Sequence, residues 1–329
     1  MKVAIMGCGP GGSYLYCLLK RRKPEVEVEL FDVPHATRCG IQPCGWAVSF
    51  PLFHGLLREI ALVPDRYVLG RYGQMVIDGI RLRANIAVID KPLLIKHMLA
   101  NESPQKIPVN QLDKYDRVID ATGQRAFLPS CEVRVIEAIE NRVKVGSLVA
   151  PAAFLNNNSW GYSWLIPLGN GEAHFGSLSL RGAAECRLEL ERLRTELSLG
   201  PAICACQGQI WSSGAILPFM HGNVWGLGQS IGLVEPMSGA GITPAMDSAR
   251  IMVENWDDPV SYEKVVLSRY SSMVRMAQVV HKLARGEAPT MLDAFLSRGA
   301  SNIVGIYPGI TGLIRLVRKI KDKVNGYAD

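Results

Sequence analysis

The order of apolar and polar positions at the N-terminus predicts a strand, a helix and a second strand. An apolar run over residues 3–6 precedes a glycine-rich loop at 7–12, and a stretch with helical spacing covers 13–22. Apolar and polar positions then alternate from Val26 to Asp32, which is typical of a strand. This βαβ order predicts an open α/β fold with parallel strands.

The glycine-rich loop has the spacing of a dinucleotide-binding fingerprint. Gly7 permits a tight turn, Gly9 lets the backbone approach a pyrophosphate, and Gly12 lets the helix pack against the strand. The N-terminus of the helix would face the phosphates with its partial positive charge. Asp32 follows Gly12 by twenty residues, at the position where an acidic side chain binds ribose hydroxyls. We therefore expect an adenine dinucleotide.

The pattern changes along the rest of the chain. Alternation in "RYGQMVIDGIRLRANIAVID" at 71–90 predicts antiparallel strands, and residues 91–101 predict a short helix with Pro92 in its first turn. The other predicted elements are a strand at 117–121, strands over 131–215 with one charged helix at 183–197, and helices from about 243 onward.

Composition and charge narrow the class of protein. Hydrophobic residues make up 48% and charged residues 20% of 329 positions, which describes a globular chain with a large core. No apolar run is long enough for a membrane span, and the apolar run after Lys2 is too short for a signal peptide, so we expect a cytoplasmic protein. The net charge of +6 is modest, and no basic stretch interleaved with aromatic residues indicates nucleic acid.

The eight cysteines do not have the spacing of a zinc site. Cys39 and Cys44 lie five positions apart, and Cys204 and Cys206 form a Cys-x-Cys pair. In a reducing cytoplasm most of these residues are expected to be free thiols. We therefore predict no metal site.

A second glycine cluster, "GLGQSIGLVEPMSGAGI" at 226–242, lies more than two hundred residues after the first. A nicotinamide enzyme holds its cofactor with the first βαβ unit and neighbouring strand ends and leaves this cluster without a purpose. A flavoenzyme that binds an extended FAD needs a second contact where a strand meets a helix near the flavin, and glycines give backbone N–H groups room for that contact. The alternative is a glycine-rich turn between a strand and a packed helix.

Several stretches resemble, in matching order, the geranylgeranyl reductase family of p-hydroxybenzoate-hydroxylase-like flavoproteins. They are "GCGPGGSYL", "RCGIQPCGW", "VIDKPLLIKHML", "YDRVIDATG", "GYSWLIPLGNGEAHFGS" and "GLGQSIGLVEPMSGAGI". The resemblance implies an FAD-dependent oxidoreductase that reduces C=C bonds of a prenyl chain by hydride transfer from reduced flavin. It implies a Rossmann-like FAD-binding domain, an antiparallel-sheet substrate domain and C-terminal helices.

The resemblance also assigns cofactor contacts residue by residue. The cofactor-binding positions are Gly7, Gly9, Gly12, Asp32, Cys39, Gly40, Lys91, Gly123, Gly228, Gln229, Gly241 and Ile242. Lys91 stands where the family has Arg, and Gln229 stands where it has an Asp that binds the ribityl chain, so a negative charge is lost there. The chain is shorter than typical members, which predicts a smaller or more open substrate pocket.

The expected domains follow the same resemblance. Residues 1–130 form the first part of the FAD-binding domain, with an antiparallel insertion at about 61–90. Residues 131–215 form the sheet-rich substrate domain, 216–255 return to the FAD-binding domain, and 256–329 form a C-terminal helical region.

Several residues are candidates for the chemistry. Tyr162, Trp164 and Pro167 of the substrate signature are expected to line an apolar pocket, although aromatic core residues of a sheet would have the same pattern. Cys39 and Cys44 are candidates for a thiol proton donor or a dithiol relay, and the alternative is that they are small buried apolar residues. We interpret His54 and His174 as histidines with satisfied hydrogen bonds.

The C-terminal segment "GLIRLVRKIKDKV" has Leu, Ile and Val on one helix face and Arg and Lys elsewhere. Such a helix can lie on an anionic membrane surface, but a terminal helix docked on the core with a solvated basic face is the favoured interpretation.

The expected substrate is an apolar small molecule or lipid. NAD(P)H or a carrier protein such as ferredoxin would supply the electrons. Two other functions remain open: a flavin-dependent monooxygenase or halogenase, because "GYSWLIP" is similar to the halogenase signature, and a flavin-binding protein without turnover.

Overall fold

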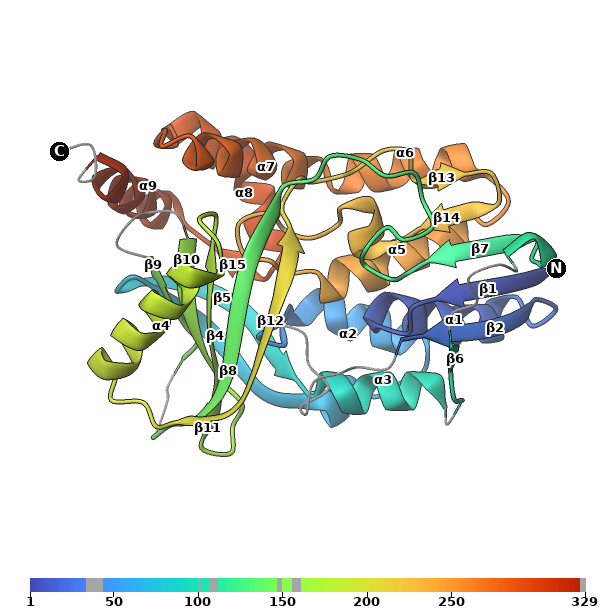
Figure 1. Ribbon diagram of the computed structural model, residues 1–329, viewed down its shortest axis with the longest axis horizontal. Helices are drawn as coiled ribbons and strands as arrows, with labels where there is room; N and C mark the ends of the chain where they lie inside the picture. Colours follow the sequence, from blue (N-terminus) through green and yellow to red (C-terminus); the bar gives the residue numbers. More distant parts are fainter. Residues whose placement is uncertain (34–43, 101, 107–111, 147–149, 156–160, 326–329) are drawn as a thin grey trace.

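The computed structural model describes residues 1–33, 44–100, 102–106, 112–146, 150–155 and 161–325. Cys39 and Gly40 lie outside the described residues, so their roles stay predictions. Figure 1 shows two sheets next to each other, a smaller one near the N-terminus and a larger one with long strands, with helices packed around both. One cluster of buried apolar residues extends through both sheets, from Ile5 and Met6 to Ile136 and Trp164.

The smaller sheet carries the βαβ unit predicted at the N-terminus. Its strands are β1 (Lys2–Met6), β2 (Glu27–Asp32), β6 (Gln105–Lys106), β7 (Arg117–Asp120), β13 (Met220–His221) and β14 (Val224–Gly226). The strand order is β13-β14-β7-β1-β2-β6, and β1 is parallel to β2 and β7. β7 is also parallel to β14, so a segment from the last third of the chain completes the N-terminal sheet.

The larger sheet contains the strands predicted over 131–215 and three from the N-terminal part. Its strands are β3 (Ala47–Ser49), β4 (Val68–Ile77), β5 (Ile80–Ile89), β8 (Val135–Lys144), β9 (Ala152–Leu155), β10 (Gly161–Pro167), β11 (Glu172–Ser179), β12 (Ala202–Trp211) and β15 (Ile306–Tyr307). The order is β12-β8-β11-β10-β9-β4-β5-β15, with β3 also paired to β5. β4 and β5 are antiparallel, as predicted, and β4 joins this sheet through β9.

β15 corrects one expectation, because the sequence predicts only helices in the C-terminal region. Ile306 pairs with Ala84, and the N–H of Asn85 donates to the carbonyl of Gly305 at 2.8 Å. Residues 306 and 307 form a strand because the backbone of β5 pairs with them. Pairing with a distant strand cannot be seen in a local sequence pattern.

The helices cover both sheets. They are α1 (Pro10–Arg22), α2 (Phe50–Glu59), α3 (Lys91–Leu99), α4 (Ala183–Glu196), α5 (Ile242–Glu254), α6 (Pro259–Arg269), α7 (Ser271–Ala284), α8 (Met291–Ile303) and α9 (Ile310–Asn325). α3 begins where predicted: the Asp90 carboxylate accepts from the N–H of Leu93, and Pro92 lies in the first turn. In Figure 1, α7, α8 and α9 gather on one side of the larger sheet.

The C-terminal helix α9 packs on the protein through its apolar face. Val317 is buried, and Ile320 and Val324 pack against a cluster of buried residues from α7 and α8. On the basic face, the ammonium of Lys319 donates to the carboxylate of Asp78 at 2.8 Å. These contacts fit the docked-helix interpretation. In the described part of the chain, no helix combines the length and the apolar character that crossing a membrane requires.

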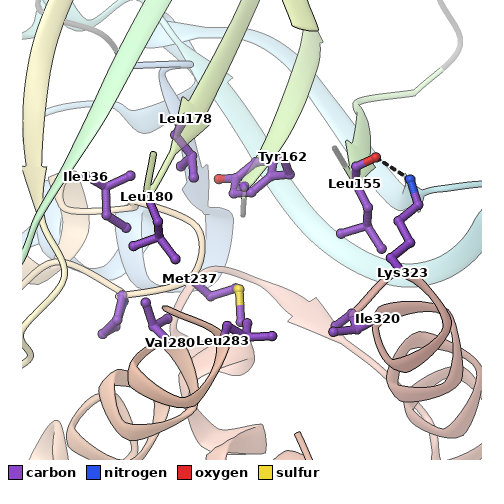
Figure 2. A pocket seen from close by; sticks show the side chains of 12 residues that line it. Ile136, Leu155, Tyr162, Leu178, Leu180, Met237, Val280, Leu283, Ile320 and Lys323 are labelled. Carbon is purple, nitrogen blue, oxygen red and sulfur yellow. Dashed lines mark hydrogen bonds between the residues drawn. The ribbon is translucent and has the colours of Figure 1, made fainter. Parts of the chain in front are cut away.

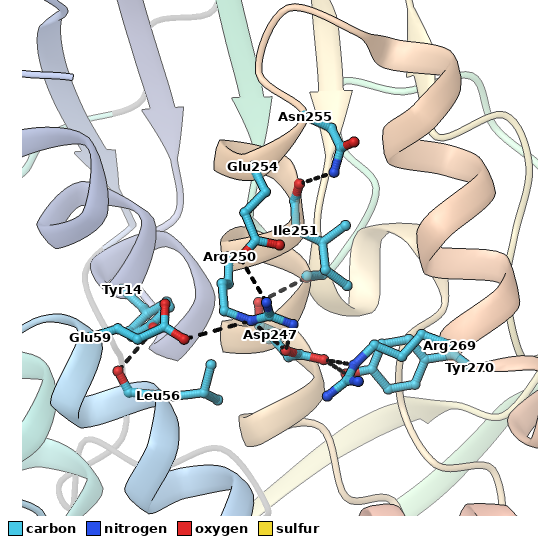
Figure 3. Close-up of polar contacts among 12 residues, drawn as sticks. Tyr14, Leu56, Glu59, Asp247, Arg250, Ile251, Glu254, Asn255, Arg269 and Tyr270 are labelled. Atoms are coloured by element: carbon cyan, nitrogen blue, oxygen red, sulfur yellow. Dashed lines mark hydrogen bonds and ion pairs between the residues drawn. The ribbon is translucent and has the colours of Figure 1, made fainter. Parts of the chain in front are cut away.

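A buried carboxylate holds α5 in place (Figure 3). Asp247 on α5 accepts hydrogen bonds from Arg250 on the same helix and from Arg269 and Tyr270, where α6 ends and α7 begins. The Tyr270 hydroxyl lies 2.7 Å from the carboxylate. The contacts pair the buried charge of Asp247 with two guanidinium groups and thereby fix the helix whose N-terminus follows the second glycine cluster.

Candidate cofactor and substrate site

Glycines are required where the first loop meets the end of β7. Gly7 has φ +106°, and a Cβ there would lie 2.5 Å from the carbonyl oxygen of Ala121. A Cβ on Gly12 would lie 2.0 Å from the carbonyl oxygen of Gly7. The fingerprint roles predicted for these two residues, a tight turn and close packing of helix on strand, match this geometry.

Gly9 differs from its two neighbours in the fingerprint. A Cβ on Gly9 would meet no described atom within 4 Å. Gly9 is also the N-cap of α1, and among the described residues no side chain caps this end. The first turn of α1 therefore presents backbone N–H groups to an open space, as the dinucleotide fingerprint requires for a pyrophosphate.

The segments around Gly123 and Gly228 meet at a shared carboxylate. Asp120, at the end of β7, is buried and accepts hydrogen bonds from the hydroxyls of Thr122 and Ser230 at 2.7 and 2.9 Å. The N–H of Gly123 donates to the Ser230 hydroxyl at 3.1 Å. The second glycine cluster therefore lies at the same sheet edge as Gly7 and Gly12.

Gln229 also joins these two segments, because its side-chain N–H donates to the carbonyl of Gly123 at 2.8 Å. An Asp side chain at this position has no N–H to donate. The departure from the family at Gln229 is therefore accompanied by a contact that fixes the loop at Gly123.

Asp32 lies at the end of β2, one residue beyond Phe31, which pairs with Met6. Its carboxylate accepts from the N–H of Val33 at 2.9 Å. The predicted ribose-binding acid therefore lies on the strand next to the glycine-rich loop. The open space at Gly9, the uncapped helix N-terminus and this acid together fit an adenine dinucleotide.

Gly241 and Ile242 lie at the other end of the second glycine cluster, as the N-cap and first residue of α5. A turn precedes them, in which the N–H of Glu235 donates to the carbonyl of Ala240 and the N–H of Gly239 donates to the carbonyl of Glu235, both at 2.9 Å. Gly239 has φ +71°, a conformation that favours glycine. The glycines at 239 and 241 thus belong to one compact turn.

A buried polar cluster lies beside residues 44–46. Glu140 on β8 accepts a hydrogen bond from the indole of Trp164 at 3.1 Å and one from the backbone N–H of Cys44. His174 on β11 lies with its Nδ1 3.8 Å from the Glu140 carboxylate, and its ring lies edge-on to Trp46 with centroids 4.5 Å apart. We name Glu140, His174, Trp164 and Trp46 the inner cluster.

Burial shifts both titratable groups of the inner cluster toward their neutral forms. Loss of hydration raises the pKa of Glu140 to about 7, against a smaller lowering by its hydrogen bonds and the charge of Lys91. Loss of hydration and the nearby charge of Arg142 lower the pKa of His174 to about 4. Lys91, a predicted cofactor residue, thus lies close enough to act on this cluster.

The interpretation of His174 as a histidine with satisfied hydrogen bonds stays a prediction. Neither ring nitrogen has a partner of regular hydrogen-bond geometry among the described residues, but the backbone of Gly45 lies close enough to raise the pKa of His174 against the effect of burial. Cys44, the described member of the predicted thiol pair, is a free, partly buried cysteine beside the inner cluster. In the described segments, no three His, Cys, Asp or Glu side chains gather as metal ligands.

An apolar cavity lies between the larger sheet and the helices α7 and α9 (Figure 2). Its lining comes from four strands, two helices and the turn after β14. The lining residues are Ile136, Leu155, Gly161, Tyr162, Leu178, Leu180, Pro236, Met237, Val280, Leu283, Ile320 and Lys323. The cavity has a volume of about 50 Å³, which holds a few carbon atoms, since one water needs roughly 10–15 Å³ on the same measure.

The three predicted pocket residues have different places. Tyr162 lines the cavity, and its hydroxyl donates to the carbonyl of Ser238 at 2.7 Å. Trp164 lies beside Tyr162, with ring centroids 5.9 Å apart, but its indole belongs to the inner cluster. Neither Trp164 nor Pro167 is among the described residues that line this cavity.

Two buried glutamates near the site escaped sequence reasoning. Glu140 stands in the strand "VIEAIENRVK", in which Glu137, Glu140 and Asn141 do not follow a period of two, so the pattern does not show which face of the strand each side chain occupies. Glu235 stands between two apolar residues and Pro236 in the second glycine cluster. Only Glu235 could have been noticed in the sequence, because a charged residue in an otherwise apolar turn next to a cofactor loop is unusual.

Comparisons with solved structures identify the fold. A geranylgeranyl bacteriochlorophyll reductase-like protein from Thermoplasma acidophilum superimposes with a TM-score of 0.74 and 18% identity, over 98% of this chain and 97% of that one. A tryptophan 6-halogenase from Streptomyces toxytricini gives 0.67 and 13%, over 98% and 96%. The probable FAD-dependent monooxygenase pqsL from Pseudomonas aeruginosa gives 0.62 and 17%, over 92% and 99%.

Sequence comparison is less informative, because no family model and no curated protein matches the chain. The similarity of structure nevertheless covers nearly the whole chain. The protein therefore has the fold shared by the geranylgeranyl bacteriochlorophyll reductase-like protein and by FAD-dependent monooxygenases and halogenases, as the resemblance in its sequence predicts.

Proposed function

We propose that the protein is an FAD-dependent oxidoreductase that reduces C=C bonds of a prenyl chain. The adenine end of the cofactor would lie on the loop at 7–12 with Asp32, and the flavin end would lie on the turn at 239–241. Reduced FAD supplies the hydride for such a reaction. The residues of this chain bind and orient the two reactants and exclude water.

The observation that carries the proposal is the apolar cavity next to the cofactor turn. Pro236 and Met237 line the cavity, and the same segment continues directly into Gly239 and Gly241. A substrate that enters between α7, α9 and the sheet therefore meets the cofactor turn at the inner end of the cavity. Apolar lining of this kind suits a hydrocarbon chain.

The size of the cavity sets what it can hold. At about 50 Å³ it accommodates a short part of a prenyl chain. The rest of the chain would extend outward past Ile320 and Lys323 on α9. The smaller or more open substrate pocket expected from the sequence stays a prediction.

A second candidate is a flavin-dependent monooxygenase or halogenase. It draws support from the similarity in fold to pqsL and to the tryptophan 6-halogenase, and from "GYSWLIP" on β10. Both candidates use the same cofactor site and differ in whether the reduced protein reacts with an alkene or with oxygen.

Anaerobic mixing separates the two candidates. The FAD-loaded protein is reduced with dithionite, freed of excess reductant and mixed with geranylgeranyl diphosphate without oxygen. The proposed function predicts that the flavin absorbance returns and that mass spectrometry finds product with two added hydrogens per reduced bond. Reduced flavin that persists with the lipid, together with a hydroxylated or halogenated product once oxygen, an aromatic substrate and halide are admitted, would support the alternative instead.

A further inference from the structure

A polar pocket lies where β4, β5 and β15 meet. It has a volume of about 430 Å³, and its described lining shares no residue with that of the apolar cavity. Sites that bind small molecules measure roughly 300–1,000 Å³, so the pocket is large enough for a ligand. Side chains with hydrogen-bond donors dominate its lining. We name the pocket formed by Arg71, Tyr72, Arg83, Asn85 and Tyr307 the arginine pocket.

A β-bulge forms part of the arginine pocket. The register between β4 and β5 shifts there, because β4 has one residue, Gly73, where β5 has two, Ala84 and Asn85. All three residues line the pocket. Bulges redirect neighbouring side chains and recur next to functional sites. In addition, β15 pairs Tyr307 with Arg83, so these two side chains lie on the same face of the sheet.

Neither guanidinium group of the arginine pocket is paired with a carboxylate in the described part of the chain. The Arg71 guanidinium carbon lies 3.7 Å from the centre of the Phe50 ring, a contact that helps to fix its position. Among the described residues, neither Arg71 nor Arg83 forms an ion pair within 4.0 Å, and no Asp or Glu belongs to the pocket lining. The pocket therefore combines two positive charges with further donors and has no acidic group to balance them.

We propose that the arginine pocket binds a phosphate group of a phosphate ester, either the diphosphate of a prenyl substrate or a phosphate of a nicotinamide dinucleotide that donates electrons. Guanidinium groups bind phosphate oxygens through charge-assisted hydrogen bonds, and the phenol and amide groups donate to the remaining oxygens. The choice between these two ligands rests on the proposed function. The phosphate site itself does not, because binding is measured without turnover.

Calorimetric titration of the FAD-loaded protein with sodium pyrophosphate tests the site. FAD occupies the loop at 7–12, so pyrophosphate cannot bind there. We expect the wild type to bind pyrophosphate, and Arg71→Gln and Arg83→Gln to bind it about 10-fold more weakly or worse, because each variant loses a charged donor. Both arginines are exposed, so the variants should keep the melting temperature of the wild type. Wild-type protein that binds no pyrophosphate would overturn the proposal.

Arg81→Gln is the matched control. Arg81 is an exposed arginine on β5, the strand of Arg83, and it does not line the pocket. At about 0.15 M ionic strength, where exposed charges are screened beyond about 8 Å, this variant should bind pyrophosphate within about twofold of the wild type. An equal loss of affinity in Arg81→Gln and Arg83→Gln would mean that the surface attracts anions through its general charge, and it would overturn the assignment to the pocket.

Displacement titrations identify the ligand that supplies the phosphate group. Geranylgeranyl diphosphate that displaces pyrophosphate, where geranylgeraniol does not, would assign the pocket to the head group of the substrate. Displacement by NADPH would assign it to the electron donor, and displacement by neither compound would overturn the binding of a phosphate ester. A wild-type protein that binds pyrophosphate but leaves the lipid unreduced would contradict the proposed function and leave the phosphate site standing.

Discussion

The two sheets contribute to the site in different ways, one through its backbone and the other through its side chains. At the edge of the smaller sheet, backbone geometry defines the site: Gly7 and Gly12 stand where a Cβ would collide with neighbouring carbonyl oxygens. At the larger sheet, side chains define it: Tyr162 lines the cavity, and Glu140 and His174 are buried in the inner cluster. The first kind of site can be recognised in a sequence because only glycine meets the requirement, whereas the second depends on which strands become neighbours.

A large expected effect on stability tests the requirement for glycine in the loop at the smaller sheet. Gly12→Ala places a Cβ 2.0 Å from the carbonyl oxygen of Gly7, and we expect it to lower the free energy of unfolding by about 3 kcal/mol. The Cβ that Gly9→Ala adds would meet no described atom within 4 Å. The free energy of unfolding of this variant should therefore differ from that of the wild type by less than about 0.5 kcal/mol. Urea unfolding of the two apo variants measures the difference.

The same pair distinguishes packing from ligand contact. Gly9→Ala should weaken FAD binding by at least about 10-fold, which corresponds to roughly 1.4 kcal/mol, because the added methyl group enters the space assigned to the pyrophosphate. Fluorescence titration with FAD checks this value. If Gly9→Ala binds FAD as tightly as the wild type, the open space at Gly9 is not the pyrophosphate site.

The contribution of buried side chains at the larger sheet is tested through the pH dependence of stability. Glu140 has its pKa raised to about 7, so the folded state holds its proton more tightly than the unfolded state. Its contribution therefore falls as pH rises from about 4.5 to 7, by about 3 kcal/mol in total. His174 has its pKa lowered to about 4, so its contribution rises by a similar amount between pH 4 and 6.5.

In the wild type the two slopes oppose each other and nearly cancel between pH 4.5 and 6.5. Relative to the wild type, Glu140→Gln should gain stability as pH rises from 4.5 to 7, and His174→Gln should lose stability as pH rises from 4 to 6.5. Unfolding free energies measured across this range give both differences. Parallel curves for wild type and Glu140→Gln would mean that Glu140 titrates with an ordinary pKa.

The sequence predicted the parts of the fold that depend on local pattern. The βαβ unit, the hairpin of β4 and β5 and the proline-containing start of α3 all follow from periodicity and turn chemistry. It did not predict β15, whose two residues form a strand only because the edge of β5 is nearby. Tertiary context also joined β4 and β5 to the larger sheet through β9.

The residues of the site also fall into a group that the sequence predicted and a group that it did not. The spacing of glycines predicted a dinucleotide loop at Gly7 and Gly12, and the family resemblance assigned Gly123 and Gly228 to the same cofactor. Asp120 joins the segments of Gly123 and Gly228, and a Cβ on Gly7 would meet Ala121, the residue that follows Asp120. The side chains of the inner cluster could not be predicted, because Glu140, Trp164 and His174 come from three different strands and meet only after the sheet forms. Their strand patterns do not distinguish a buried polar pair from a solvated face.

The most direct test of the account is the visible absorption spectrum of the purified protein after incubation with FAD and gel filtration, recorded before and after anaerobic addition of dithionite. The account predicts flavin bands that stay with the protein and bleach on reduction, because the segments at 7–12 and 226–242 form one FAD site. A colourless protein that takes up no FAD would contradict it, and the second glycine cluster would then be only a turn between a strand and a packed helix.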